Sequence, residues 1–384
     1  MIFGYDGKRA VLNNTGLGNY SRLLVEVMSR FYPDNSYRLY TPEVKPNPRL
    51  EEVLGHDNVS LVTPDEKYIT RWKPFWRTLN MASQMVGEGV GLIHGLSGEL
   101  PVNIASAGVP SVVTVHDVIF RYYPECYHLV DRKIYDYKFR KSVHAATRVL
   151  AISECTARDV VKFYGIDPGK IDVVYQGCHA QFRRDVPADE IAQVRRKYGI
   201  ERPYIICVGT VEARKNQMMA VRGLRGLPDE FDLVIVGRRT SSYSRTIDSY
   251  LNTYNTTDRI KFIDYADFAD LPALYAGAFC SSYTSLYEGF GIPVIESLSV
   301  GTPVIVASGS CLEEAAGPSA PVVSPGDIGE WISLAKELFN YPEARRRIAA
   351  EGRQYVSRFT DEAMACGTME CYRKAIEDYE RHKK

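Results

Sequence analysis

The chain has 384 residues, of which 45% are hydrophobic and 24% are charged, and lysine plus arginine equal aspartate plus glutamate at 47 each. This composition is typical of a globular protein, the length suggests two domains, and the zero net charge gives no support for binding to nucleic acid. No apolar run approaches the roughly 18 residues of a membrane span, and the N-terminus reaches a charge too early for a signal peptide, so we expect a cytoplasmic protein.

The first half of the chain alternates between strand-like and helix-like segments. After Gly16-Leu17-Gly18, apolar residues follow helical spacing from Tyr20 to Phe31, and Asn19 is the expected helix start. A second helix is expected from Ser153 to about Phe163. Short apolar strands are expected at 92–94, 111–115, 149–152 and 171–175. Strands that alternate with helices indicate a parallel α/β sheet.

The second half repeats this alternation after a polar, helical connector at 183–202. Its expected strands lie at 204–208, 231–236, 260–263, 278–281, 304–307 and 321–323. We therefore predict two similar α/β domains, 1–180 and 181–358, with a C-terminal helix at 359–384 that could pack back on the first. Ligands of such sheets bind outside the carboxyl ends of the strands.

The segment 285–296 is the most informative part of the chain. Glu288 and Glu296 stand eight positions apart, with glycines and a proline between them. Pro293 suits the first position of a helix, which would place Glu288 in the preceding loop and Glu296 in the opening turn. Gly289 and Gly291 would let backbone N–H groups approach an anion at this helix N-terminus. The combination suits a sugar attached to a nucleotide diphosphate.

Each of these candidate residues also has a structural explanation. A generic strand–turn–helix unit accounts for Glu296, because acids favour the first turn, but accounts less well for Glu288 in a glycine loop. Arg214 and Lys215 follow a predicted strand and could neutralise a diphosphate, or could be a solvated pair. His116 ends another strand, where a lone histidine is commonly a core or capping residue.

Several motifs together resemble the large retaining glycosyltransferase family 4. The segment Ser-Leu-Tyr-Glu-Gly-Phe-Gly-Ile-Pro with Glu288-x7-Glu296 is similar to the hallmark of that family. Gly209 to Asn216, Val115-His116-Asp117 and Asn14 to Tyr20 are similar to further family segments. The resemblance implies the GT-B fold, in which two Rossmann-like domains with parallel sheets face each other.

The resemblance also implies roles for individual residues. Glu288 and His116 would contact the donor sugar as catalytic-site residues, with Asp117 assigned beside them, and Glu296 would hold the ribose. The remaining donor-binding residues would serve the phosphates, through side chains or backbone N–H groups, and are Gly16, Gly18, Arg214, Lys215, Gly289, Phe290 and Gly291. No metal and no cofactor is implied beyond the nucleotide sugar, which is the substrate.

The implied activity is retaining transfer of a hexose to a glycan or lipid-linked acceptor in polysaccharide synthesis. Similarity to mannosyltransferase-like bacterial members favours GDP-mannose, with a UDP-sugar as the alternative. Another GT-B enzyme, such as an epimerase or phosphorylase, and a non-catalytic nucleotide-sugar-binding protein remain alternatives. The basic, aromatic segment 71–77, with Trp72 and Trp76, is either a surface loop with a packed tryptophan or a contact with a lipid-linked acceptor or membrane, which would place the protein peripherally on the inner face.

Overall fold

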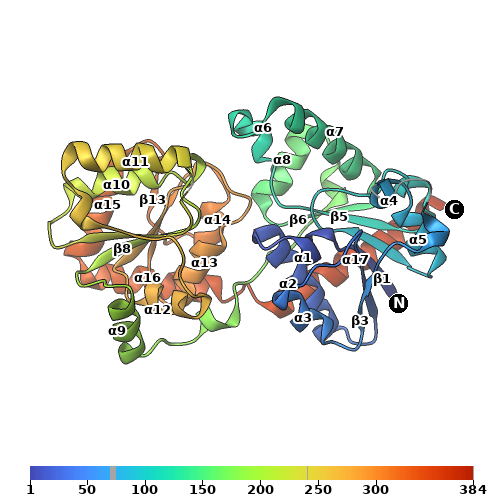
Figure 1. Ribbon diagram of the computed structural model, residues 1–384, viewed down its shortest axis with the longest axis horizontal. Coiled ribbons are helices and arrows are strands. Elements are labelled where there is room, and N and C mark those ends of the chain that lie inside the picture. The colour runs from blue at the N-terminus through green and yellow to red at the C-terminus, as the bar shows by residue number, and fades with distance from the viewer. Residues whose placement is uncertain (70–74, 240, 384) are drawn as a thin grey trace. The chain divides into compact units, whose positions relative to one another are not determined.

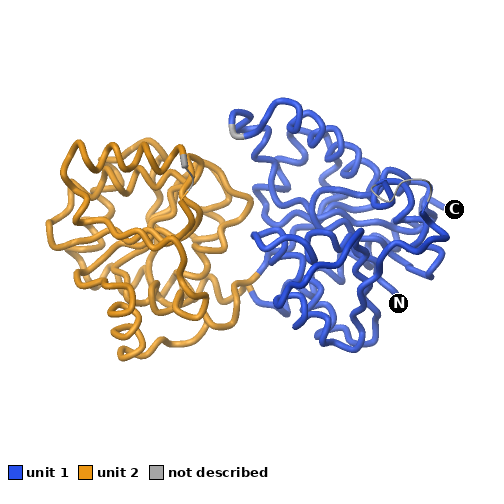
Figure 2. The backbone as a smooth tube through the Cα atoms, in the orientation of Figure 1, with its two compact units in different colours: residues 1–176, 360–384 blue, residues 177–359 orange. Residues whose placement is uncertain are grey.

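The computed structural model describes residues 1–69, 75–239 and 241–383 and divides into two compact units (Figure 1 and Figure 2). Unit 1 comprises Met1–Gln176 and Thr360–Lys384, and unit 2 comprises Gly177–Phe359. Each unit therefore has its own sheet and core, and unit 1 is built from two separate stretches of chain.

The sheet of unit 1 is parallel throughout. In the described part of the chain it contains seven strands in the order β3-β2-β1-β4-β5-β6-β7. The direction of strand addition reverses between β1 and β4, which is a topological switch point where ligands of α/β sheets bind. The strands are β1 (Ile2–Asp6), β2 (Ser36–Tyr40), β3 (Val59–Val62), β4 (Leu92–Gly95), β5 (Ser111–Val115), β6 (Arg148–Ala151) and β7 (Ile171–Val173).

Among the helices of unit 1, α8 has clear local signals at both ends. The Ser153 side chain accepts a hydrogen bond from the Thr156 N–H at the start of α8, and Gly165 ends that helix in the left-handed conformation. The helices are α1 (Lys8–Leu12), α2 (Gly16–Phe31), α3 (Pro48–Leu54), α4 (Trp76–Leu79), α5 (Met81–Gly87), α6 (Ile119–Tyr122), α7 (Leu129–Ala145), α8 (Glu154–Tyr164) and α17 (Asp361–Lys383).

Unit 2 repeats the same topology. Its parallel sheet has six strands among the described residues, in the order β10-β9-β8-β11-β12-β13, with the switch point between β8 and β11. The strands are β8 (Tyr204–Val208), β9 (Asp232–Val236), β10 (Ile260–Ile263), β11 (Cys280–Tyr283), β12 (Val304–Ala307) and β13 (Val322–Val323). The helices are α9 (Ala188–Lys197), α10 (Gln217–Gly223), α11 (Ser241–Tyr254), α12 (Leu271–Ala276), α13 (Ile292–Ser299), α14 (Leu312–Ala316), α15 (Ile328–Asn340) and α16 (Pro342–Val356).

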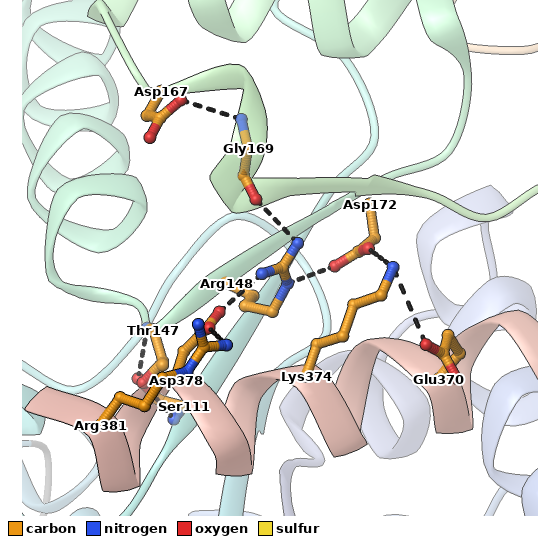
Figure 3. A network of polar contacts seen from close by, with 10 residues as sticks. All are labelled: Ser111, Thr147, Arg148, Asp167, Gly169, Asp172, Glu370, Lys374, Asp378 and Arg381. Atoms are coloured by element: carbon orange, nitrogen blue, oxygen red, sulfur yellow. Dashed lines mark hydrogen bonds and ion pairs between the residues drawn. The ribbon is translucent and has the colours of Figure 1, made fainter.

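The helix α17 is fastened to unit 1 by a network of charged side chains (Figure 3). Arg148, at the start of β6, donates from Nε to Asp172 at 2.5 Å and from Nη1 to Asp378 of α17 at 2.6 Å. Lys374 of α17 donates to the other oxygen of Asp172 at 2.9 Å. On the opposite, carboxyl-terminal part of the sheet, buried His94 of β4 lies 2.6 Å from the hydroxyl of Tyr372. The C-terminal segment is thus an integral part of unit 1.

The predicted α/β class with parallel sheets is confirmed, whereas several element boundaries were wrong. The helix α2 begins at Gly16 with Thr15 as its N-cap, so Asn19 is not its start. The strands β2 and β3 were not predicted, and β11 lies two residues later than expected. The helix α13 begins at Ile292 rather than Pro293, because Gly291 takes the N-cap position with φ +125°.

The segment 71–77 lies partly outside the described residues, since 70–74 are among those not described. Trp76 is 1% exposed and donates from its indole N–H to Gln84 at 2.8 Å, within the core under α4 and α5. Trp76 is therefore a packed core residue and does not offer its ring to a membrane. No helix in the described ranges combines the length and the apolar character needed to cross a bilayer.

Candidate functional site

The predicted donor residues of unit 2 gather at the carboxyl ends of its central strands. The strand β8 ends at Val208 and β9 at Val236, and each is followed by a glycine with positive φ. A Cβ at Gly237 would lie 2.1 Å from the carbonyl oxygen of Gly209, so the turn after β9 can approach the turn after β8 only with glycine at position 237. The segment that carries Arg214 and Lys215 leaves from this point, beside the switch point of the sheet.

A buried cluster of charges joins Arg214, Lys215 and Glu288. The carboxylate oxygen Oε1 of Glu288 lies 2.6 Å from Nζ of Lys215 and 2.9 Å from Nη1 of Arg214. The Lys215 ammonium also donates to the hydroxyl of Tyr283, at the end of β11, at 2.5 Å. The side chain of Glu288 is 11% exposed, which leaves a small opening toward solvent. The structure therefore brings together three of the predicted site residues.

Opposite charges hold all three groups ionised despite their burial. Burial by itself raises the pKa of Glu288, but Lys215 and Arg214 outweigh this effect and the pKa is lowered overall. Burial likewise opposes the charge of Arg214, but Glu288 and Glu212 leave its pKa raised. Burial also opposes the charge of Lys215, but Tyr283 and Glu288 leave its pKa raised. The cluster has a fixed charge pattern across neutral pH.

Backbone contacts fix the geometry of the cluster. Arg214 donates from Nη1 to the carbonyl oxygen of Tyr287 at 2.8 Å and pairs with Glu212 at 2.6 Å. Its own carbonyl accepts from the Leu286 N–H at 2.7 Å. Asn216, in the left-handed conformation, donates to the carbonyl oxygen of Thr284 at 3.2 Å. The turn after β8 and the loop after β11, nearly 70 residues apart in sequence, thus form one rigid surface.

The glycine loop after Glu288 is held in place by contacts with Cys311 and Phe359. The Cys311 thiol contacts the carbonyl oxygens of Glu288 at 3.1 Å and of Phe290 at 2.7 Å. The Phe290 ring is 3% exposed and packs edge-on against Phe359. Phe290 therefore anchors the loop through its side chain, which leaves Gly289 and Gly291 on either side of a fixed point.

Glu296 lies apart from the charge cluster, in a different environment. It is the fifth residue of α13, so it lies beyond the first turn, contrary to the prediction. Its carboxylate accepts a hydrogen bond from the hydroxyl of buried Tyr275 at 3.1 Å, and no cation is paired with it among the described residues. Burial raises its pKa to about 7, although the Tyr275 hydrogen bond acts in the opposite direction. Helix-start electrostatics does not explain this residue.

In unit 1, His116 follows β5 and is held as a neutral imidazole. Its Nε2 lies 2.8 Å from the carbonyl oxygen of Leu96, so Nε2 carries the proton and Nδ1 is left as an acceptor. The edge of the Tyr20 ring packs on it at a centroid distance of 4.5 Å. Burial lowers its pKa to about 4, against the effect of the Leu96 hydrogen bond. The neighbouring Asp117 accepts from the N–H of Ile119 at 3.1 Å and shapes the turn.

Gly16 and Gly18 lie in the first turn of α2 rather than in a loop. A Cβ on Gly18 would lie 1.8 Å from the carbonyl oxygen of Asn13, so only glycine fits there. A Cβ on Gly16 would meet nothing within 4 Å. The expected flexible loop is therefore a helix N-terminus in this structure, and Gly18 sets how closely α2 approaches the chain that follows α1.

Unit 1 also contains a cavity of about 620 Å³ that the sequence analysis did not predict. Arg77 lies within its wall, paired with Asp6 at the end of β1 at 2.5 Å and with Glu99 beyond β4 at 2.9 Å. The other wall is α7, which contributes several basic residues, among them Lys138 and Lys141. The cavity thus opens at the carboxyl end of the unit 1 sheet.

Sequence reasoning missed three residues that shape the donor-side site. Tyr283 bonds Lys215, Tyr275 bonds Glu296 and Glu212 pairs with Arg214. Tyr283 lies two residues before the two-glutamate segment, and Glu212 belongs to the motif that contains Arg214, so their positions offered a signal. Tyr275, on α12, carried no motif that could have revealed it.

Two family models and several curated proteins that are similar to this chain are all glycosyltransferases. A model of the family Glycosyltransferase Family 4 matches residues 16–182, and a model of Glycosyl transferases group 1 matches residues 190–355. O-antigen chain mannosyltransferase RfbU of Salmonella typhimurium is 28% identical over 64% of this chain and 65% of its own length. O-antigen chain mannosyltransferase B of Escherichia coli is 27% identical over 73% of this chain and 74% of its own length.

Solved structures give the same fold. Anabaena HepE in complex with UDP and glucose has a TM-score of 0.75 at 17% identity, covering 97% of this chain and 98% of that one. Sucrose-phosphate synthase from Thermosynechococcus elongatus has a TM-score of 0.75 at 19% identity, with the same coverage of both chains. The two family models together span most of the chain, and both sheets agree with the GT-B fold. The chain belongs to glycosyltransferase family 4 and has the GT-B fold.

Proposed function

We propose that this glycosyltransferase moves a hexose from a nucleotide-diphosphate sugar to a saccharide acceptor, with retention of anomeric configuration. The observation that carries the proposal is the cluster of Arg214, Lys215 and Glu288 at the switch point of the unit 2 sheet. Two buried cations can stabilise the negative charge that develops on a departing diphosphate. The carboxylate between them can accept hydrogen bonds from sugar hydroxyls.

The proposed role of each residue follows from its environment. Lys215 and Arg214 hold the diphosphate, and Glu288 orients the hexose between them. Glu296, whose carboxylate has a hydroxyl neighbour but no cation, accepts hydrogen bonds from the ribose. His116, neutral with Nδ1 as an acceptor, receives a hydroxyl of the sugar. Gly289 and Gly291 are proposed to supply backbone N–H groups, and Gly16 and Gly18 to face the donor phosphates and the acceptor.

The hexose is proposed to be mannose, carried on GDP. Support comes from the O-antigen mannosyltransferases, which are similar over 64% and 73% of this chain. The unit 1 cavity is the proposed acceptor site, because its polar and ionic wall of Asp6, Arg77 and Glu99 suits a saccharide. Polysaccharide synthesis is the corresponding process.

The donor is tested by measuring transfer from radiolabelled GDP-mannose and UDP-glucose to a mixture of bacterial lipid extracts, together with a thermal-shift panel of GDP, UDP, ADP and CMP. Bound nucleotide raises the melting temperature by mass action. A shift by GDP and incorporation of mannose are expected. A shift by UDP alone would contradict the GDP assignment, and product formation without an acceptor would favour an epimerase or a hydrolase.

The phosphate role is tested by Lys215→Ala, with Lys336→Ala on the exposed face of α15 as the matched control. Removal of a charge that acts on the transition state typically costs on the order of 100-fold or more in kcat. We expect that loss for Lys215→Ala at an unchanged circular dichroism spectrum, and full activity for Lys336→Ala. A folded Lys215→Ala enzyme with full activity would refute the diphosphate assignment.

A further inference from the structure

The helix α7 carries apolar residues on two opposite sides. Its inner side packs into the core of unit 1 through Tyr135, Phe139 and Val143. Val130, Ile134 and Tyr137 follow the spacing i, i+4, i+7 on the other side, where they are 66%, 52% and 58% exposed. A helix that simply covers a sheet carries polar residues on its outer face. The helix lies along the outside of unit 1, drawn in green in Figure 1.

Basic side chains lie beside this apolar stripe and, at Lys141, at its C-terminal end. Lys133, Lys138, Arg140 and Lys141 are all exposed on α7, and Nζ of Lys141 lies 4.9 Å from the centroid of the Tyr137 ring. Long basic side chains of this kind cover apolar surface with their stems while the charged ends reach phosphate groups.

The acids of the same helix do not cancel this charge on the outer face. Asp136 is turned inward, where it accepts a hydrogen bond from the Tyr164 hydroxyl at 2.8 Å and pairs with Arg121 at 3.3 Å. Asp131 is exposed on the same flank as Lys138, where it offsets one of the four exposed basic residues. The outer face of α7 therefore carries an apolar stripe, and the exposed basic residues on and beside it outnumber the exposed acid.

We propose that the outer face of α7 binds the surface of a bilayer that contains anionic phospholipids. A stripe of apolar residues edged by lysine and arginine fits the boundary between acyl chains and headgroup phosphates. A second copy of the chain fits less well, because a symmetric dimer through this face would bring the basic edges of two helices together. The proposal moves the membrane contact from the segment around Trp76, whose ring is buried, to α7.

The location has a consequence for the cavity of unit 1. Tyr137, Lys138 and Lys141 of α7 also line that cavity. A bilayer against the outer face of α7 would bring the cavity to the level of the headgroups, where the saccharide of a lipid-linked acceptor lies. This consequence rests on the proposed acceptor site, whereas the membrane contact does not depend on which sugar is transferred.

The test is co-sedimentation of the full-length protein with vesicles of phosphatidylcholine alone and of phosphatidylcholine with phosphatidylglycerol. The variants are Val130→Ser/Ile134→Ser for the stripe and Lys133→Gln/Lys141→Gln for the basic residues around it. Tyr265→Ser, which alters a 78% exposed side chain of unit 2, is the matched control. The circular dichroism spectrum and the melting temperature of each variant check that it is folded.

We expect binding to the anionic vesicles that weakens with salt, falls about tenfold in Val130→Ser/Ile134→Ser and falls roughly fivefold for each lysine neutralised. The Tyr265→Ser control should bind as the wild type does. The proposal is overturned if the wild type ignores anionic vesicles, or if folded α7 variants bind them unchanged. A dimer in solution that Val130→Ser/Ile134→Ser abolishes would also overturn it and assign the stripe to self-association.

Discussion

Glu296 makes a prediction that couples stability to nucleotide binding. Burial raises its pKa to about 7 in the folded protein, against an ordinary value of 4.5 in the unfolded chain. The folded state therefore holds this proton more tightly than the unfolded state. As pH rises from 4.5 through 7, the protein loses stability, and the loss is complete above the folded pKa at about 3 kcal/mol.

Replacement of Glu296 by glutamine removes the loss of stability that comes from ionising a buried carboxyl group, and it retains an acceptor for the Tyr275 hydroxyl. We expect Glu296→Gln to match the wild type in urea denaturation near pH 5, to within about 1 kcal/mol, and to exceed it by up to about 3 kcal/mol near pH 8. A second variant, Tyr275→Phe, removes a hydrogen bond to the carboxylate and should raise the pKa further. Equal stability differences at both pH values would refute the reasoning.

The same group should govern affinity for the nucleotide. If ribose hydroxyls donate to the ionised carboxylate, affinity falls roughly tenfold for each pH unit below about 7. Glu296→Gln should bind more weakly and lose this dependence, and its residual pH profile corrects for ionisation of the nucleotide phosphate. Calorimetric titration with GDP and UDP measures both. An identical pH profile in the wild type and the variant would show that the ribose does not use Glu296.

Glu288→Gln releases Arg214 and Lys215 from their shared carboxylate, so the free nucleoside diphosphate should bind severalfold more tightly by calorimetry while kcat falls on the order of 100-fold; weaker binding would contradict this role. Gly18→Ala should lower the melting temperature by several degrees, because its Cβ would lie 1.8 Å from a backbone carbonyl, whereas Gly16→Ala, with open space, should leave it unchanged; equal melting temperatures would refute the steric argument. Asp378→Asn removes the charged partner of Arg148 on α17 and should therefore speed amide hydrogen exchange in this helix, by an amount that corresponds to roughly 2 kcal/mol. Unchanged exchange would show that the helix is held by its other contacts.

Local patterns predicted the buried apolar strands better than the others. The strands β5, β8 and β12 have the predicted bounds, because each is a short, buried apolar run. The strand β10 also has the predicted bounds, although it is an edge strand and mostly half-buried. The strands β2 and β3 escaped prediction because they mix polar and apolar residues. The sequence gives no local sign that the segment with Arg38 pairs along its whole length with β1.

The sequence predicted which residues belong to the candidate site but not which of them contact each other. The glycines and the proline of the segment predicted the loop that contains Glu288. The pairing of Glu288 with Lys215, however, depends on two loops that follow different strands and meet in space. Pro293 suggested a helix start one residue too late, and Glu296 consequently lies beyond the first turn, where burial rather than the helix dipole sets its pKa. The unit 1 cavity arises from packing between separate elements, which no local pattern encodes.

The return of the chain to unit 1 has a consequence for biosynthesis. The helix α17 supplies Tyr372, Lys374 and Asp378 to the sheet of unit 1, but it is translated after all of unit 2. Unit 2 is one continuous stretch and can fold while the ribosome is still at work. Unit 1, although its sheet is made first, must wait for its last helix, and until then the polar and aromatic groups that α17 covers remain exposed to solvent.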